Sequence, residues 1–167
     1  RYHLFDVEQD TAVKTQREEI ARLRRALDEQ EFVLHYQPKV NMHTGQIASV
    51  EALVRWQHPT QGLLLPDRFL PLAEELDLGA VITRWVADRA CADAVAWIRQ
   101  GLDLRQVAIN ISPSHWRTGA LPEALVEALR RNGLPASRLA VELTEGMLHT
   151  DLDASLRQMQ QIAKIGV

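Results

Sequence analysis

Residues Ser49–Pro59, SVEALVRWQHP, have an apolar strand pattern that nevertheless carries an acid and a base. Side chains alternate across a strand, so Glu51, Leu53 and Arg55 share one face while the apolar residues between them share the other. Glu51 and Arg55 lie about 13 Å apart along a strand, so a direct ion pair between them is not expected. Burying either charge without a partner costs free energy, so this face needs an explanation.

From residue 47 onward, strand patterns and helix patterns alternate. The spacing predicts strands over 31–40, 47–56, 106–112 and 138–145, a short helix from about residue 67, and longer helices over 80–100, 121–133 and 151–166. Residues 58–66 are expected to form a loop. The short connection between the first two strands predicts an antiparallel pair, and the later alternation predicts βαβ units with a parallel sheet. A closed (β/α)₈ barrel needs roughly 200 residues, so the pattern fits a small open sheet or part of a barrel.

Composition excludes several classes of protein. The chain has 167 residues, of which 46% are hydrophobic and 25% charged, which suits one folded domain with a core. A net charge of −3 gives no sign of a surface for polymeric nucleic acid. The sequence shows no membrane-spanning apolar run and no signal peptide. Its single cysteine, Cys91, falls in a helix pattern and is expected to be buried, so a cytoplasmic protein without disulfides is predicted.

Three successive strands carry a polar side chain near the carboxyl end, opposite an apolar face. These are Glu51, Asn110 and Glu142. Ligands of parallel α/β folds bind at the carboxyl ends of the strands, so the three side chains are expected to converge. Two carboxylates and a carboxamide suit Mg²⁺, Mn²⁺ or Ca²⁺ rather than structural zinc. With Arg55 as a phosphate contact, this set predicts phosphoester chemistry.

Each of these residues also fits a structural role when it is taken alone. Asn110 could cap a loop, and Glu142 could begin a turn. Because the three residues recur on successive strands, a shared binding site and separate structural roles are equally supported. The tryptophans Trp56, Trp85 and Trp97 are expected in the core rather than stacked on a ligand.

Six motifs in this order resemble the EAL-domain family, the phosphodiesterases that hydrolyse cyclic di-GMP. The resemblance covers about residues 27–167. The motifs are EFVLHYQPKV, TGQIASVEALVRWQHP, PDRFLPLAEELDL, RWVADRAC, VAINISP and VELTEGML. It implies an α/β fold, a TIM-like (β/α)₈ barrel with an antiparallel first strand, of which the chain covers about the first half. It also implies a pair of Mg²⁺ or Mn²⁺ ions and cleavage of cyclic di-GMP to linear pGpG.

The resemblance also implies roles for individual residues, position by position. Glu51, Asn110 and Glu142 match metal ligands, and Glu51 is thereby catalytic. Glu145 matches a second, catalytic glutamate that steadies a loop beside the metals. The positions that match substrate contacts are Gln37, Leu53 and Arg55.

The chain departs from the family pattern in two respects. Asp77 stands where glycine is common, and aspartate tolerates the left-handed turn expected there. The family's paired-aspartate DDFG motif, and a later lysine, glutamate and glutamine, would follow Val167. The 167 residues alone are therefore expected to be inactive. The alternatives are a receptor that binds cyclic di-GMP without cleaving it, and a barrel hydrolase acting on another phosphoester.

The first residues resemble a different module. RYHLFD is similar to the last strand of a GGDEF (diguanylate cyclase) domain, and a charged helical segment follows it. Residues 1–26 are therefore interpreted as the end of a preceding GGDEF-like domain with its linker, and residues 27–167 as the first half of an EAL domain. A parent protein of this kind is expected to form homodimers through the EAL domain and could be membrane-anchored through upstream regions.

Overall fold

A mixed five-stranded sheet lies at the centre of the computed structural model, which describes residues 18, 21–149 and 151–167. The strands are β1 (Phe32–Val40), β2 (Ile47–His58), β3 (Gly62–Leu64), β4 (Gln106–Asn110) and β5 (Leu139–Glu142). Their order is β1-β2-β4-β5, with β3 paired to β2. The β1–β2 and β2–β3 pairs are antiparallel, and the β2–β4 and β4–β5 pairs are parallel. The predicted hairpin and parallel strands are confirmed, whereas the loop predicted over 58–66 is wrong because β3 forms inside it.

Three long helices follow the strands, as the sequence pattern predicts. They are α3 (Gly79–Arg99), α5 (Leu121–Asn132) and α7 (Leu152–Ile165), and the short elements are η1 (Pro66–Arg68), α2 (Leu70–Glu75), α4 (Pro113–Thr118), η2 (Ala136–Arg138) and α6 (Glu145–His149). The strands predicted over 106–112 and 138–145 end early, at Asn110 and Glu142, because α4 and α6 begin within three residues. Asp67 lies inside η1, so it does not cap the short helix predicted from about residue 67, and Leu65 precedes the turn without a side-chain cap.

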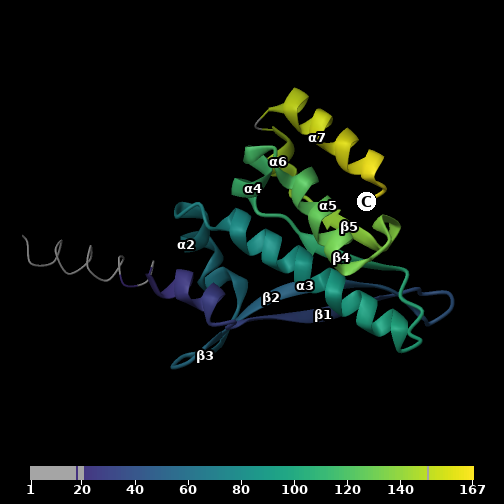
Figure 1. Cartoon of the computed structure of the whole chain (residues 1–167), viewed down its shortest axis with the longest axis horizontal. Helices are drawn as coiled ribbons and strands as arrows, with labels where there is room; N and C mark the ends of the chain where they lie inside the picture. The colour runs from purple at the N-terminus through teal and green to yellow at the C-terminus, as the bar shows by residue number, and fades with distance from the viewer. Residues whose placement is uncertain (1–17, 19–20, 150) are drawn as a thin grey trace, which may run out of the picture.

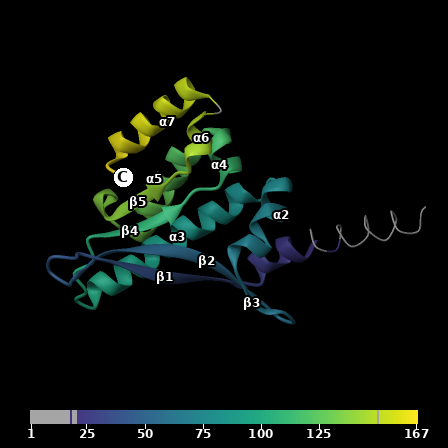
Figure 2. The same ribbon diagram turned by 180° about the vertical axis from the view of Figure 1, so that it is seen from behind.

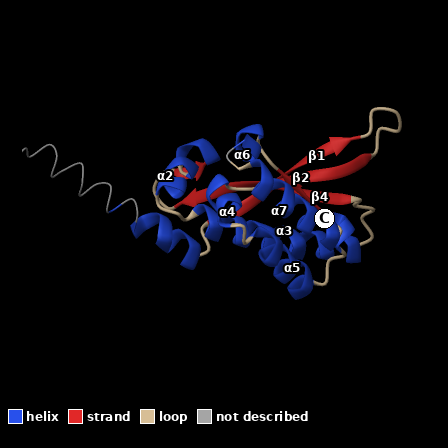
Figure 3. Ribbon diagram, turned by 90° about the horizontal axis from the view of Figure 1, so that it is seen from above, coloured by secondary structure: helices blue, strands red, loops and turns tan. Residues whose placement is uncertain are grey.

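The long helices cover one face of the sheet, as Figures 1 and 3 show. Figure 2 shows the strands β1, β2 and β4 from the other side, with α3 behind them. Register pairs place Val50 beside Val107 and Val107 beside Leu139, and all three are buried against the helices. The next positions along the strands point the other way, so the polar residues of β2, β4 and β5 lie on the face without helices.

An aromatic cluster joins the hairpin to the helices. The ring of Phe32 lies 5.8 Å from that of Trp56, 5.5 Å from that of Phe69 and 6.0 Å from that of Trp85. Trp97 packs edge-on against Tyr36 at 4.5 Å. The three tryptophans therefore pack in or against the core, as expected.

The helical residues 21–28 attach to the hairpin through a half-buried glutamate, Glu31. Arg22 forms an ion pair with Glu31, and the Trp56 indole donates to Glu31 Oε2 at 2.8 Å. Burial raises the pKa of Glu31, but the hydrogen bonds from Arg22 and Trp56 outweigh it and hold that pKa below its ordinary value. The strand predicted at RYHLFD lies outside the described residues.

Cys91 is fully buried in α3 as a free thiol, and burial raises its pKa to about 12. This agrees with its prediction as a small apolar core residue. Among the described residues, none of the helices is long and apolar enough to cross a membrane.

Both ends of α7 are capped. Asp151 and Asp153 both stand near the start of α7, and Asp151 is the N-cap, with Oδ1 accepting from the Ala154 amide at 2.9 Å. Gly166 ends the helix with a φ of 98°. Asp77 adopts a left-handed φ of 54°, as expected where it replaces a glycine.

Replacing Asp151 by alanine is expected to lower the free energy of unfolding by about 1 kcal/mol, because the Ala154 amide loses its acceptor. Urea denaturation of the full-length protein measures the change. Asp153→Ala is the matched control, since Asp153 lies inside the first turn, and it should cost less than half as much. Equal losses from the two substitutions would contradict the assignment of the cap.

Candidate functional site

Strand register brings the three predicted ligand residues to the face of the sheet that carries no helices. Asn110 and Glu142 are direct register partners on β4 and β5. Glu51 on β2 pairs with Ala108, two residues before Asn110 and therefore on the same face. Gln37 on β1 pairs with Glu51 across the hairpin. The convergence expected from the sequence is thus present in the register itself.

Side-chain contacts join these residues. Asn110 Nδ2 donates to Glu51 Oε1 at 2.8 Å. The ammonium of Lys39 forms an ion pair with Glu142 and lies 3.7 Å from Glu51 Oε2. The hydrogen bond to Glu142 raises the pKa of Lys39 above its ordinary value, and both carboxylates add to this electrostatically. Lys39 therefore links the two acids.

Lys39 is a site residue that sequence reasoning missed. A signal was available, because Lys39 lies two positions after Gln37 in β1 and so shares its face. The antiparallel register sets Lys39 opposite Ser49, which is two residues before Glu51. Its contact with β5 also requires the sheet to curve, which no residue pattern of β1 indicates.

The site is open to solvent. The side chains of Glu51, Glu142 and Lys39 are 20%, 36% and 47% exposed, respectively. Ion pairs with this exposure contribute little to stability, about 0–1 kcal/mol. A divalent cation could therefore replace the Lys39 ammonium without unfolding the surrounding strands.

The donor chemistry of the cluster fits a hard cation, although only as part of a ligand set. Two carboxylates and a carboxamide supply the oxygen ligands that Mg²⁺ and Mn²⁺ prefer. The Lys39 ammonium between the carboxylates shows that a positive charge is accommodated there. Within the described ranges, no group of three or more His, Cys, Asp or Glu residues gathers around a potential metal position. A complete site would therefore need further ligands.

The structure places the four other predicted site residues at different distances from this cluster. Gln37 is exposed opposite Glu51, and Leu53 lines a pocket beside Asn110. Arg55 Nη1 donates to the Val54 carbonyl at 2.8 Å, and among the described residues it makes no ion pair with Glu51. The remaining one, Glu145, begins α6 three residues after Glu142.

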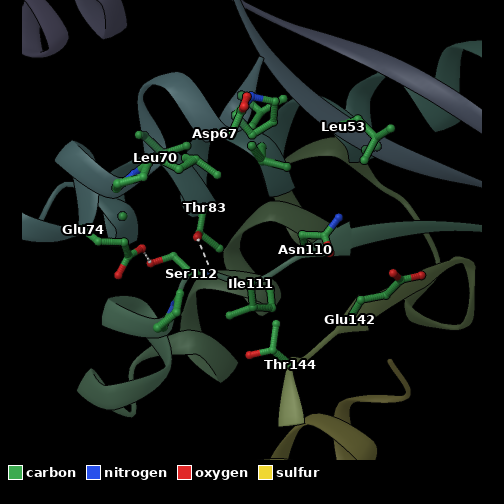
Figure 4. A pocket seen from close by; sticks show the side chains of 18 residues that line it. Leu53, Asp67, Leu70, Glu74, Thr83, Asn110, Ile111, Ser112, Glu142 and Thr144 are labelled. Carbon is green, nitrogen blue, oxygen red and sulfur yellow. Dashed lines mark hydrogen bonds between the residues drawn. The ribbon is translucent and has the colours of Figure 1, made fainter. Parts of the chain in front are cut away.

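A largely apolar pocket of about 470 Å³ adjoins the cluster. Figure 4 shows Leu53, Leu70 and Ile111 on its walls, with Asn110 and Glu142 at one side. The pocket lies between β2, the η1–α2 segment, α3 and the ends of β4 and β5. Its size suits a small organic ligand, and its walls favour a flat or apolar group.

The carboxylate of Glu74 holds the chain just after Asn110. Glu74 of α2 accepts from Ser112 Oγ through one oxygen and from the Ser114 amide, at 2.9 Å, through the other. The Ser112 amide donates to Thr83 Oγ1 of α3 at 3.3 Å (Figure 4). Ser112 also caps α4 by accepting from the His115 amide at 3.3 Å. The segment that follows Asn110 is thus fixed to both α2 and α3.

The hydrogen bonds from Ser112 and Ser114 to Glu74 are called the Glu74 clamp. Gly79 leaves the space that this clamp occupies. A methyl group at Gly79 would overlap Ser112 Oγ, Ser114 Oγ and the Glu74 carboxylate. Sequence reasoning missed both Glu74 and Gly79. The serine after Asn110 and the proline behind it were signals for an N-cap, but nothing in the local pattern identifies Glu74 as its partner.

Comparison with known proteins gives one consistent family. The EAL domain family model matches residues 20–167. MucR of Pseudomonas aeruginosa, a bifunctional diguanylate cyclase/cyclic di-GMP phosphodiesterase, is 38% identical over 166 residues, which are 99% of this chain and 24% of MucR. The cyclic di-GMP phosphodiesterase NbdA of the same organism is 38% identical over 145 residues, which are 87% of this chain and 18% of NbdA. The chain spans between 18% and 24% of the length of these curated relatives.

Comparison with solved structures gives the same family. The PaMucR phosphodiesterase in its c-di-GMP complex superposes with a TM-score of 0.85 at 40% identity, covering 90% of this chain and 61% of that one. The Xanthomonas citri FimX EAL domain, also in complex with c-di-GMP, gives a TM-score of 0.82 at 25% identity, covering 94% and 60% of the two chains. The expected fold, part of a TIM-like (β/α)₈ barrel with an antiparallel first strand, is confirmed over the part that the chain spans.

Replacing Gly79 by alanine is expected to lower the free energy of unfolding by about 1–3 kcal/mol, because the added methyl group displaces hydrogen-bonded groups. Thermal and urea unfolding of the full-length protein measure this loss. Gly146→Ala is the control, since its methyl group would meet nothing within 4 Å. A Gly79→Ala protein as stable as the wild type would show that the clamp is looser than its contacts indicate.

Proposed function

Since the chain belongs to the EAL-domain family, we propose that its full-length protein hydrolyses cyclic di-GMP to linear pGpG with Mg²⁺ or Mn²⁺. The observation that carries this proposal is the convergence of Glu51, Asn110 and Glu142 beside a pocket of about 470 Å³. Oxygen ligands beside a small-molecule pocket are what a metal-dependent phosphodiesterase requires. The names of MucR and NbdA support the same activity.

Glu51, Asn110 and Glu142 are proposed to hold the metal ions. Asn110 Nδ2 already donates to Glu51, which leaves its Oδ1 as the atom available for a cation. A bound metal lowers the pKa of a water molecule and takes up negative charge on the phosphate oxygens. The clamp from Glu74 serves this arrangement by fixing the chain two residues beyond Asn110.

The substrate is proposed to lie across the pocket and the exposed ends of the strands. Leu53 lines the pocket, and Gln37 stands exposed beside Glu51, so both can contact a nucleotide. The Arg55 guanidinium would have to turn from the Val54 carbonyl toward a phosphate, a strong bidentate acceptor. Glu145 is proposed to steady the loop between β5 and α6 beside the metals.

Catalysis is proposed to require protein beyond these 167 residues. The described residues supply two carboxylates to the site, and the chain covers 61% of the MucR phosphodiesterase structure. The remaining carboxylates are expected from the rest of an EAL domain, including its paired aspartates. The chain alone is therefore expected to be inactive. We also propose that the full-length protein forms homodimers through its EAL domain and carries an upstream GGDEF-like domain.

Hydrolysis of cyclic di-GMP by the full-length protein, followed by chromatography of pGpG in Mg²⁺ or Mn²⁺, tests the proposal. Glu51→Ala should lower turnover by at least about 100-fold, because it removes a proposed metal ligand. Glu123→Ala, an exposed acid on α5, is the matched control and should keep wild-type turnover. Unchanged turnover in Glu51→Ala would contradict the proposed role of Glu51 as a metal ligand.

A receptor that binds cyclic di-GMP without cleaving it is the alternative. It predicts saturable binding of the nucleotide with no pGpG formed by the wild-type protein in either metal. Binding measured by calorimetry alongside the hydrolysis assay separates the two functions. If cyclic di-GMP fails to bind at all, the substrate itself is wrong.

A further inference from the structure

We propose that Lys39 is a built-in competitor of the divalent cation, which holds Glu51 and Glu142 in the metal-free protein and leaves them when a metal binds. The inference rests on the proposed metal site and deepens it by adding a residue that sets the metal affinity. Lys39 comes from β1, outside the three strands that supply the proposed ligands.

The Lys39 ammonium lies between the two carboxylates that are proposed to bind the metal. Lys39 Nζ pairs with Glu142 Oε1 and lies 3.7 Å from Glu51 Oε2. Among the described residues, Lys39 is the one cation that pairs with either carboxylate. β1 and β5 are three strand spacings apart, about 14 Å in a flat sheet, so the bridge spans the concave face of a curved one.

The ammonium and a divalent cation would use the same oxygens. Glu51 Oε1 already accepts from Asn110, so the remaining oxygen of that carboxylate is the one that faces Lys39. A positive charge at this position also repels an incoming dication. Any contact that stabilises only the metal-free protein must weaken metal binding by the same factor, because the two equilibria are linked.

Lys39 is able to leave. Its side chain is 47% exposed, and a four-carbon stem allows the ammonium to turn into solvent at small cost. An exposed pair of this kind has a modest free energy, so the competition is expected to shift the metal affinity rather than abolish it. The protein would then load its site only above a cation concentration that Lys39 helps to set.

Titration of the metal-free full-length protein with Mn²⁺ alone tests the first consequence. Calorimetry should show Lys39→Met binding Mn²⁺ about three- to tenfold more tightly than the wild type, because the competing contact is lost. Lys39→Arg keeps the charge and should stay within about twofold of the wild type. Lys164→Met, which removes an exposed lysine of α7, is the matched control and should change nothing.

A second measurement distinguishes displacement of Lys39 from the simple loss of a charge. The wild-type protein is treated with an amine-reactive ester, with and without saturating Mn²⁺, and acylation at each lysine is followed by mass spectrometry. Lys39 should react several-fold faster with Mn²⁺ present because its ammonium is then released, while Lys164 in the same sample should keep its rate.

The outcomes separate this inference from the proposed function. If Mn²⁺ binds but the acylation rate of Lys39 does not change, or if Lys39→Met binds Mn²⁺ equally or more weakly, Lys39 is not a competitor. If the wild-type protein binds no Mn²⁺, the proposed metal site is wrong and the inference is overturned with it. Only tighter binding in Lys39→Met together with faster acylation in Mn²⁺ supports the proposal.

Discussion

The parallel register of β2, β4 and β5 determines which side chains face the helices and which face the opposite side of the sheet. It sets Val50 beside Val107 and Asn110 beside Glu142, so one face is wholly apolar and the other carries acids and amides. Because the side-chain period of a strand is two, a slip of one residue would send the acids into the helix layer and expose the core. Once the apolar face is buried under α3 and α5, the alternation of side chains along each strand places the polar residues on the opposite face.

The polar face in turn explains contacts that the fold alone does not require. Glu51 and Glu142 lie close enough to be bridged by one ammonium, and they share the surface with a carboxamide that donates to one of them. Around this cluster, hydrogen bonds to Glu74 hold the chain just after Asn110, while the side chains of Glu51, Glu142 and Lys39 stay accessible to solvent. This combination of a fixed backbone and exchangeable side chains is what a metal-dependent site needs.

Much of this arrangement could be predicted from the sequence, for physical reasons that also mark the limits. Alternation in Ser49–Pro59 gave the face of Glu51, and the strand–helix order gave the parallel sheet. The Glu74–Ser112 contact joins residues 38 positions apart and the Lys39–Glu142 contact joins residues 103 apart, and no local pattern encodes either. The early ends of β4 and β5 were missed because the alternation of apolar and polar residues continues through Ser112 and Thr144, immediately before α4 and α6 begin.

Glu51, Asn110 and Glu142 are proposed to hold metal ions beside a nucleotide pocket. A crystal structure of the full-length protein with Mn²⁺ and the proposed product pGpG, with data collected at the manganese absorption edge, tests this proposal. An anomalous peak is expected about 2.1 Å from oxygens of all three side chains, with a phosphate of the nucleotide in contact with the metal. Manganese bound elsewhere, with these three side chains still joined to one another and to Lys39, would contradict it.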